Sequence, residues 1–354
     1  MQRLSPAPRA LPIASAAVGV SLILLFMVGT LGGAVRDGIT DPSLTTISLW
    51  LIVLGMTGGA LVLLLASWSM TLAVRANRQT RDQEVLAARA SAAASRQSAF
   101  VAFGFTLAVI VVFGFLQLLL LNDGKLQQTF LQWQLMRDSA VDVVRAFAVN
   151  IKLAVISQAL VLVLGLILAV ARMAPGKAGA PLRFMAVAYI DIMRAVPAII
   201  VLYLIGFGLP LTNLPILAGL SPDWFAIIAL TLTYSAYVAE IYRSGIVSIH
   251  PSQWAASRSL GFGYLQTLRW FILPQAIRLV VPPLLSAFIA LQKDTSLVNV
   301  IGTLDAFNQA KFYASSSFNL SSVSVVAIVF VVLTIPQTRY VDWKLSRANK
   351  RMRG

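Results

Sequence analysis

Eight apolar segments, each close to the length of a bilayer crossing, restrict the folds that this sequence can adopt. Inside the hydrocarbon core every backbone N–H and C=O group must be paired within the protein, and a helix of about 20 apolar residues achieves this within one segment. We therefore predict an all-α polytopic integral membrane protein with about eight spans. The approximate span cores are residues 13–35, 46–68, 98–121, 147–171, 185–207, 223–240, 276–297 and 322–338.

The first apolar segment, 13–35, is expected to stay in the protein as a span. It is longer than the roughly 7 to 15 apolar residues of a cleavable secretory signal. Composition agrees with a membrane protein, because 58% of the residues are hydrophobic and only 12% are charged.

The distribution of Lys and Arg predicts the orientation of the spans. The formal net charge is +15, which in a soluble protein would suggest nucleic acid as a partner. Here the basic residues gather in every second connection, 75–96, 172–183 and 241–275, and again in the C-terminal tail. Such connections face the cytoplasm. We therefore expect both termini to be cytoplasmic and the lipid bilayer, not nucleic acid, to explain the charge.

The sequence divides near residue 121 by the polarity of its spans. Residues 1–121 hold three spans with almost no ionisable groups and a basic cytoplasmic linker, 75–96, that we expect to be amphipathic or partly disordered. Residues 122–345 form a core, and 346–354 form a basic cytoplasmic tail; we find no internal repeat. Polar groups at membrane depth tend to mark pathways or helix contacts. In the core these groups are Asn150, Lys152, Asp191, Arg194, Glu240, Arg243, Lys293 and Asp294.

Most catalytic and metal chemistries are excluded by the residues present. The sequence has no Cys and a single histidine, His250, so a thiolate site or a multi-His site cannot form within it. The pairs Gly124-Lys125 and Gly176-Lys177 lack the Ser or Thr that follows in a P-loop. We expect no catalytic residues and no metal site, and any ATP must be bound by another chain.

The polar stretch 253–274, QWAASRSLGFGYLQTLRWFILP, lies in the third predicted cytoplasmic connection. Pro251 restricts His250 to extended geometry and Ser252 can cap a short helix, which Gly261 would end in left-handed geometry. One interpretation is an interfacial helix that rests on lipid head groups, with Trp254 and Trp270 as anchors.

A second interpretation comes from a resemblance to a known family. The run EIYRSGIVSIHPSQWAASRSLGFGYLQTLRWFILPQAIRLVVPPLLSAFIALQKDTSLVNVIG, with the upstream YIDIMRAVPAIIVLYLIGFGLP, resembles the permeases of ABC importers for polar amino acids, the histidine, glutamine, glutamate, arginine and opine group. The resemblance covers roughly 145–345. It implies a type I ABC importer transmembrane domain with about five core helices, preceded here by three extra N-terminal helices, in a bacterial cytoplasmic (inner) membrane.

The resemblance also implies partners and a coupling loop. Residues 248–274 match the family's EAA loop, which acts as a coupling helix for a cytoplasmic ABC ATPase dimer; ATP and Mg²⁺ would be bound by that dimer. A second permease subunit, identical or related, and an extracytoplasmic substrate-binding protein complete such importers. Ala255, Ala256 and Ser257 stand where the family has Glu-Ala-Ala, so the acidic residue is missing. The coupling residues that the resemblance implies are Gln253, Ala255, Ala256, Ser257, Arg258, Leu260 and Gly261.

Several ionisable and polar residues are candidates for the translocation pathway or its gate, each with a packing alternative. Lys293 and Asp294 can instead form an internal pair that fixes helix packing. Asp191 and Arg194, three apart on one helix, can pair with each other, and Glu240 with Arg243 can orient the loop that follows. The candidates are Asp191, Arg194, Glu240, Lys293, Asp294, Thr295 and Ser296.

Three functions remain open from the sequence. The first is the membrane-spanning permease of an ATP-driven importer of a polar or charged amino acid, with ATP hydrolysis by a partner chain. The second is a stand-alone channel or secondary transporter for a small polar solute, which the lack of an evident intramembrane proton relay disfavours. The third is a membrane scaffold that binds partners without transport.

Overall fold

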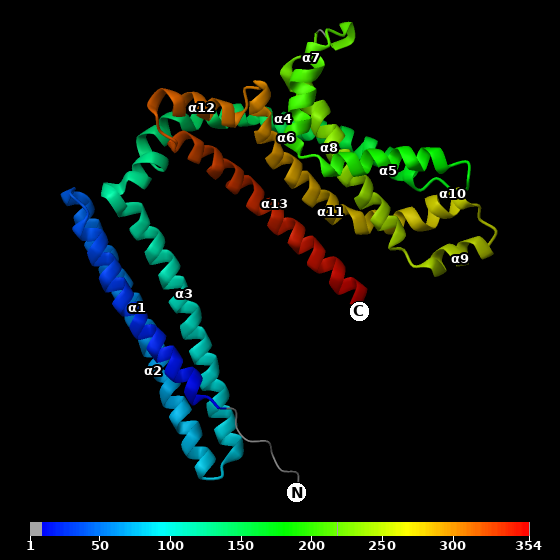
Figure 1. Cartoon of the computed structure of the whole chain (residues 1–354). Helices are drawn as coiled ribbons and strands as arrows, with labels where there is room; N and C mark the ends of the chain where they lie inside the picture. The colour runs from blue at the N-terminus through cyan, green and yellow to red at the C-terminus, as the bar shows by residue number, and fades with distance from the viewer. Residues whose placement is uncertain (1–8, 218, 354) are drawn as a thin grey trace. The chain divides into compact units, whose positions relative to one another are not determined.

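The computed structural model describes the backbone of residues 9–217 and 219–353, and side chains up to Ser346. These residues form helices and no strands, so the predicted all-α class is confirmed. The chain divides into two compact units, Met1–Gln132 and Trp133–Gly354, which are described separately (Figure 1). The boundary that we predicted near residue 121 falls where residues 121–124 leave helical geometry, within the first unit.

Three long helices form the first unit: α1 (Leu11–Asp37), α2 (Pro42–Arg81) and α3 (Val85–Phe130). With 40 residues, α2 is far longer than the hydrocarbon core requires, so its ends reach beyond it. The linker predicted at 75–96 to be amphipathic or partly disordered is helical on both sides of a short turn at 82–84. Gln83 closes this turn with a φ of +64°.

Small side chains hold the three helices together. The buried residues of α1 are Ala14, Ala17, Ser21, Leu24, Val28, Gly32 and Val35, each three or four positions after the last. Such spacing places them on one face, and small residues on that face let helices approach closely in a membrane. Ser69 and Ser95 donate hydrogen bonds to each other's carbonyl oxygens, both at 2.8 Å. A Cβ at Gly55 would lie 2.7 Å from the Phe113 ring.

A left-handed turn interrupts α3 near the predicted external end of the unit. Asn122, Asp123 and Gly124 have φ values of 54°, 55° and 69°. The Asp123 carboxylate accepts hydrogen bonds from the backbone N–H of Thr40 and, at 2.8 Å, from its hydroxyl. Asp123 therefore fastens the connection between α1 and α2 to α3.

The second unit starts with α4 (Trp133–Arg172), and its other helices pack around α8 (Pro222–Val247). In α8, 67% of the apolar window is buried, compared with 22–33% in the other apolar helices, so α8 is the central helix. The remaining elements are α5 (Ala180–Ala195), α6 (Ala198–Tyr203), η1 (Leu204–Gly208), α7 (Leu209–Leu211), η2 (Pro215–Leu217), α9 (Pro251–Ser259), α10 (Tyr264–Thr267), η3 (Leu268–Ile272), α11 (Leu273–Asp294), η4 (Thr295–Ile301), α12 (Ala306–Ser317) and α13 (Ser321–Arg353).

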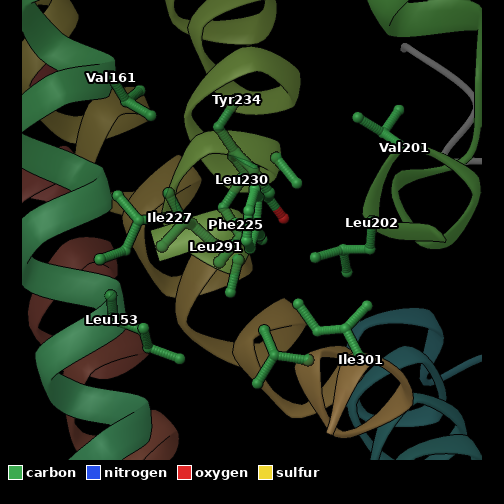
Figure 2. Close-up of a cluster of buried hydrophobic side chains, with 14 of the residues drawn as sticks. Leu153, Val161, Val201, Leu202, Phe225, Ile227, Leu230, Tyr234, Leu291 and Ile301 are labelled. Atoms are coloured by element: carbon green, nitrogen blue, oxygen red, sulfur yellow. The ribbon is translucent and has the colours of Figure 1, made fainter. Parts of the chain in front are cut away.

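One cluster of buried side chains forms the main core of this unit (Figure 2). Leu153 and Val161 come from α4, Leu202 from α6, Leu230 from α8 and Leu291 from α11, and all are at most 1% exposed. Helices far apart in the sequence therefore pack around α8.

The span predicted at 185–207 corresponds to a bent pair of helices rather than to one straight helix. Between α5 and the run Ala198–Leu211 the axis bends by 103°. Val196 is extended there, with φ −87° and ψ 128°, because a residue before a proline is disfavoured in helical geometry and Pro197 follows. Pro197 thus ends α5 and starts α6 in a new direction.

Length and composition identify six helices among the described residues that can cross a membrane, or up to seven if the bent pair is one span. One of the six is the 88-residue stretch Val85–Arg172, which contains two predicted cores, 98–121 and 147–171. The number of spans, about eight, and the cytoplasmic location of both termini stay predictions. Side chains of the predicted basic tail beyond Ser346 lie outside the described residues.

Candidate functional site

The break between α5 and α6 lines a cavity of about 870 Å³ together with α8 and α11. Residues 194–198 supply the break itself, and α8 contributes Tyr234, Tyr237 and Glu240. Pro283 and Asp294 line the cavity from α11. Irregular backbone at membrane depth is tolerated where it lines a cavity, and transporter sites often use such discontinuous helices.

Asp294 presents a carboxylate to this cavity. The Tyr234 hydroxyl donates a hydrogen bond to its Oδ2 atom at 2.7 Å. Tyr234 is only 7% exposed and belongs to the core cluster around α8, so its ring is held in place. The core thereby fixes the position of an acidic group on the cavity wall.

Arg194 brings the opposite charge to the same cavity. Its guanidinium carbon lies 5.8 Å from the centre of the Tyr237 ring, a cation–π distance. The predicted pairing of Arg194 with Asp191 is not found among the described ion pairs, although both lie on α5. Asp191 is exposed and does not line the cavity.

Glu240 lines the cavity and also forms ion pairs with two arginines near the ends of α4 and α8. The predicted pair with Arg243 is confirmed, with Nη2 of Arg243 3.0 Å from Oε2 of Glu240. The sequence did not reveal a second ion pair, between Glu240 and Arg172, the last residue of α4. Glu240 side-chain exposure is only 18%, so one carboxylate lies between two guanidinium groups in a poorly hydrated place.

Of the four residues predicted as a polar cluster at 293–296, only Asp294 lines this cavity. Lys293 is exposed and forms none of the ion pairs found among the described residues. Ser296 donates to the carbonyl oxygen of Lys293 at 2.8 Å. Lys293, Thr295 and Ser296 do not line this cavity, because helix geometry turns neighbouring residues to different sides, and their role in the pathway stays a prediction.

Thr295 belongs instead to a buried polar network with Asn150. The Asn150 amide donates to Oγ1 of Thr295 at 3.2 Å and to Oδ2 of Asp305 at 3.0 Å, and its oxygen accepts the Ala306 N–H at 3.0 Å. Asn150, Thr295 and Asp305 are all 0% exposed. One side chain of α4 thus ties η4 and the start of α12 together.

The helix predicted at 253–260 is present as α9, which begins two residues earlier. His250 is extended, as expected before Pro251, with φ −56° and ψ 135°. The predicted cap, Ser252, is wrong: Nδ1 of His250 accepts a hydrogen bond from the Ser252 N–H at 3.2 Å. Gly261 ends the helix with φ +85°, so its predicted left-handed geometry is confirmed.

One face of α9 holds it to the unit and the other is exposed. Trp254 stacks on Tyr264 at 5.5 Å and packs against a cluster that includes Ile249 and Ile272. The buried Ser257 hydroxyl donates to Oγ1 of Thr267 at 3.2 Å. Trp254 is thus held by packing contacts, whereas Trp270, the other predicted anchor, is 63% exposed. The exposed coupling candidates are Gln253, Ala255, Ala256, Arg258 and Leu260.

Comparison with known proteins identifies the second unit. Residues 161–351 match the family described as "Binding-protein-dependent transport system inner membrane component". A probable glutamine ABC transporter permease protein, GlnM of Bacillus subtilis, is 39% identical over 191 residues, which are 53% of this chain and 84% of that protein. The glutamate transport system permease protein GluC of Corynebacterium glutamicum is 37% identical over 202 residues, 54% of this chain and 87% of that protein.

A solved structure agrees with these relatives. An amino acid ABC transporter crystallised with histidines matches with a TM-score of 0.56 and 28% identity, over 61% of this chain and 99% of that one. The first unit, which ends at Gln132, precedes the family match. The chain belongs to the inner membrane components of binding-protein-dependent transport systems and is a multi-pass permease subunit of an ABC importer in the cytoplasmic membrane.

Proposed function

We propose that this permease carries a polar or charged α-amino acid through the cavity between α5, α6, α8 and α11. The observation that carries the proposal is the presence of a carboxylate, Asp294, and a guanidinium, Arg194, on the wall of one cavity of about 870 Å³. An α-amino acid has an ammonium and a carboxylate group, and recognition of each by the opposite charge fits these two side chains. The two relatives, a probable glutamine permease and a glutamate permease, support the same class.

The energy for transport is proposed to come from a separate ABC ATPase dimer that binds ATP and Mg²⁺ and contacts the exposed face of α9. Glu240 supports this assignment, because it lines the cavity and lies on the helix that leads directly to α9. Displacement of α9 would therefore move a cavity-lining element. A second permease subunit and an extracytoplasmic binding protein complete the proposed assembly. In this assembly the cavity opens alternately to the two sides of the membrane.

Reconstitution tests the proposal against a stand-alone channel or secondary transporter. Proteoliposomes with the full chain, its co-purifying ATPase and its binding protein are expected to take up a labelled amino acid only when ATP is present. Vesicles that contain this chain alone are expected to show no uptake. Uptake by the chain alone would contradict ATP-driven transport, and partner binding without any uptake would favour a scaffold.

Replacement of Asp294 by Asn is expected to raise the KM of uptake about tenfold, because the substrate ammonium loses a charge-assisted partner worth roughly 1.5–3 kcal/mol. Initial uptake rates at varied amino acid concentration measure the change. Ser296→Ala is the matched control, since Ser296 lies two residues away and outside the cavity lining. Equal KM values for Asp294→Asn and the wild type would show that Asp294 does not contact the substrate.

A further inference from the structure

A second cavity, of about 810 Å³, lies between the end of α4, the start of α5 and α10, at the predicted cytoplasmic side of the unit. We call it the α4–α10 groove. It shares no lining residue with the cavity that Asp294 lines. Every side chain that lines it is apolar except that of Tyr264. Its volume is within the usual range of ligand pockets, about 300–1,000 Å³.

Local contacts hold the walls of the α4–α10 groove in place. The Arg183 guanidinium donates hydrogen bonds to the carbonyl oxygens of Ala174 and, at 2.8 Å, of Gly176. These bonds tie the connection after α4 to α5. On α10, Tyr264 stacks on Trp254 at 5.5 Å. The groove is therefore shaped by the fold before any ligand arrives.

The groove opens onto apolar side chains at the level where a bilayer passes from acyl chains to head groups. Its lining residues Ile167, Val170 and Leu265 are each more than half exposed, as expected of side chains that face lipid tails. The nearby Trp270 is also exposed, and the Arg269 guanidinium carbon lies 5.1 Å from the centre of its ring. Trp is enriched at the membrane interface, where Arg keeps its charge in water.

The chain segments that form the groove carry positive charge only. Neither 172–183 nor 241–293 contains an Asp or Glu. Lys177 follows the lining residue Pro175 by two positions, and Arg269 follows the lining residue Leu268 directly. Both cations are exposed and form none of the ion pairs found in the described part of the chain. Basic pockets of this kind on the cytoplasmic side of membrane proteins suit anionic head groups.

We propose that the α4–α10 groove binds an acyl chain of an anionic phospholipid from the cytoplasmic leaflet, with Lys177 and Arg269 at its phosphate. A peptide segment of a partner fits less well, because its backbone N–H and C=O groups need hydrogen-bond partners and the lining side chains offer only the Tyr264 hydroxyl. An acyl chain needs none. The inference does not depend on which solute the permease carries.

Native mass spectrometry of the full chain in detergent, titrated with phospholipid, measures the affinity for the first bound lipid. Phosphatidylglycerol is expected to bind about tenfold more tightly than phosphatidylcholine with the same acyl chains, and this preference should shrink at high salt through screening. The double variant Lys177→Glu with Arg269→Glu should abolish the preference. Arg339→Glu with Lys344→Glu, two exposed residues of α13 outside the groove lining, is the matched control and should keep it.

A bulky side chain in the groove tests the acyl-chain part of the proposal separately. Val170→Trp is expected to weaken the binding of both phospholipids about tenfold, because the indole fills the space that the chain would occupy. Val163→Trp is the matched control, since Val163 is also exposed on α4 but lies outside the groove lining.

Four outcomes would overturn the proposal. Equal lipid affinity of Val170→Trp and Val163→Trp would rule out the acyl-chain site, and equal affinity of the wild type for the two phospholipids would rule out recognition of an anionic head group. Competition by sn-glycerol 3-phosphate as strong as that by phosphatidylglycerol would assign the two cations to a free phosphate. Release of the lipid when the importer's other subunits are added would show that a protein segment covers the groove.

Discussion

Replacement of Glu240 by Gln is expected to reduce ATP-driven uptake at least about tenfold, while the chain still inserts in the membrane. The change leaves Arg172 and Arg243 without their shared carboxylate at the ends of α4 and α8. Loss of one member of a buried charge cluster costs about 3–5 kcal/mol, and the partial exposure of these side chains lowers the expected cost to about 2 kcal/mol. Uptake and ATP hydrolysis in proteoliposomes measure the effect.

The double variant Glu240→Gln with Arg172→Gln separates a coupling role from simple destabilisation. It removes Arg172, the less exposed of the two guanidinium groups left without a carboxylate, so thermal stability in detergent should recover part of the way toward that of the wild type. If Glu240 positions α8 for coupling, uptake per ATP hydrolysed should stay low despite that recovery. Full recovery of both quantities would assign Glu240 to stability alone, and wild-type uptake by Glu240→Gln would contradict the prediction entirely.

Replacement of Asn150 by Leu is expected to lower the free energy of unfolding by about 3 kcal/mol. Asn150 makes three hydrogen bonds at a site that is 0% exposed, and one of them is to the Asp305 carboxylate. Without the amide, this buried carboxylate loses one of its hydrogen-bond donors and the Ala306 N–H loses its acceptor. Denaturant-induced unfolding of the purified chain in detergent measures the change.

Asn308→Leu is the matched control on the neighbouring helix α12. Its side chain is partly buried and donates one hydrogen bond, to the carbonyl oxygen of Thr303 at 3.0 Å. We expect this variant to lose only about 1 kcal/mol. Similar losses for the two variants would indicate that the Asn150 network is no more important than a single peripheral hydrogen bond.

Local signals in the sequence predicted several features that the structure confirms. Apolar length predicted the helices, the proline after His250 predicted extended geometry, and Gly261 predicted the left-handed end of α9. The pair between Glu240 and Arg243 followed from their spacing on one helix. Each of these features depends on residues within about one helical turn of each other, where backbone geometry restricts the outcome.

Features that depend on contacts between distant segments could not be predicted in this way. Arg172 is 68 positions from Glu240 in the sequence, and Asn150 reaches a threonine and an aspartate that lie beyond α11. Only the packed arrangement of α4, α8 and α11 shows which polar residues face the cavity and which are buried. The spacing of small residues in α1 was visible in the sequence, and it would have indicated close helix packing in the first unit.

The turn at Asn122, Asp123 and Gly124 affects the order in which the chain can fold during synthesis. Asp123 reaches back to Thr40, and the contacts described for the first unit all join residues before Trp133. Domains generally fold as units, N-terminal first, while translation continues. The three-helix unit can thus complete its packing before the ribosome has made α8, so its insertion does not need to wait for the permease core.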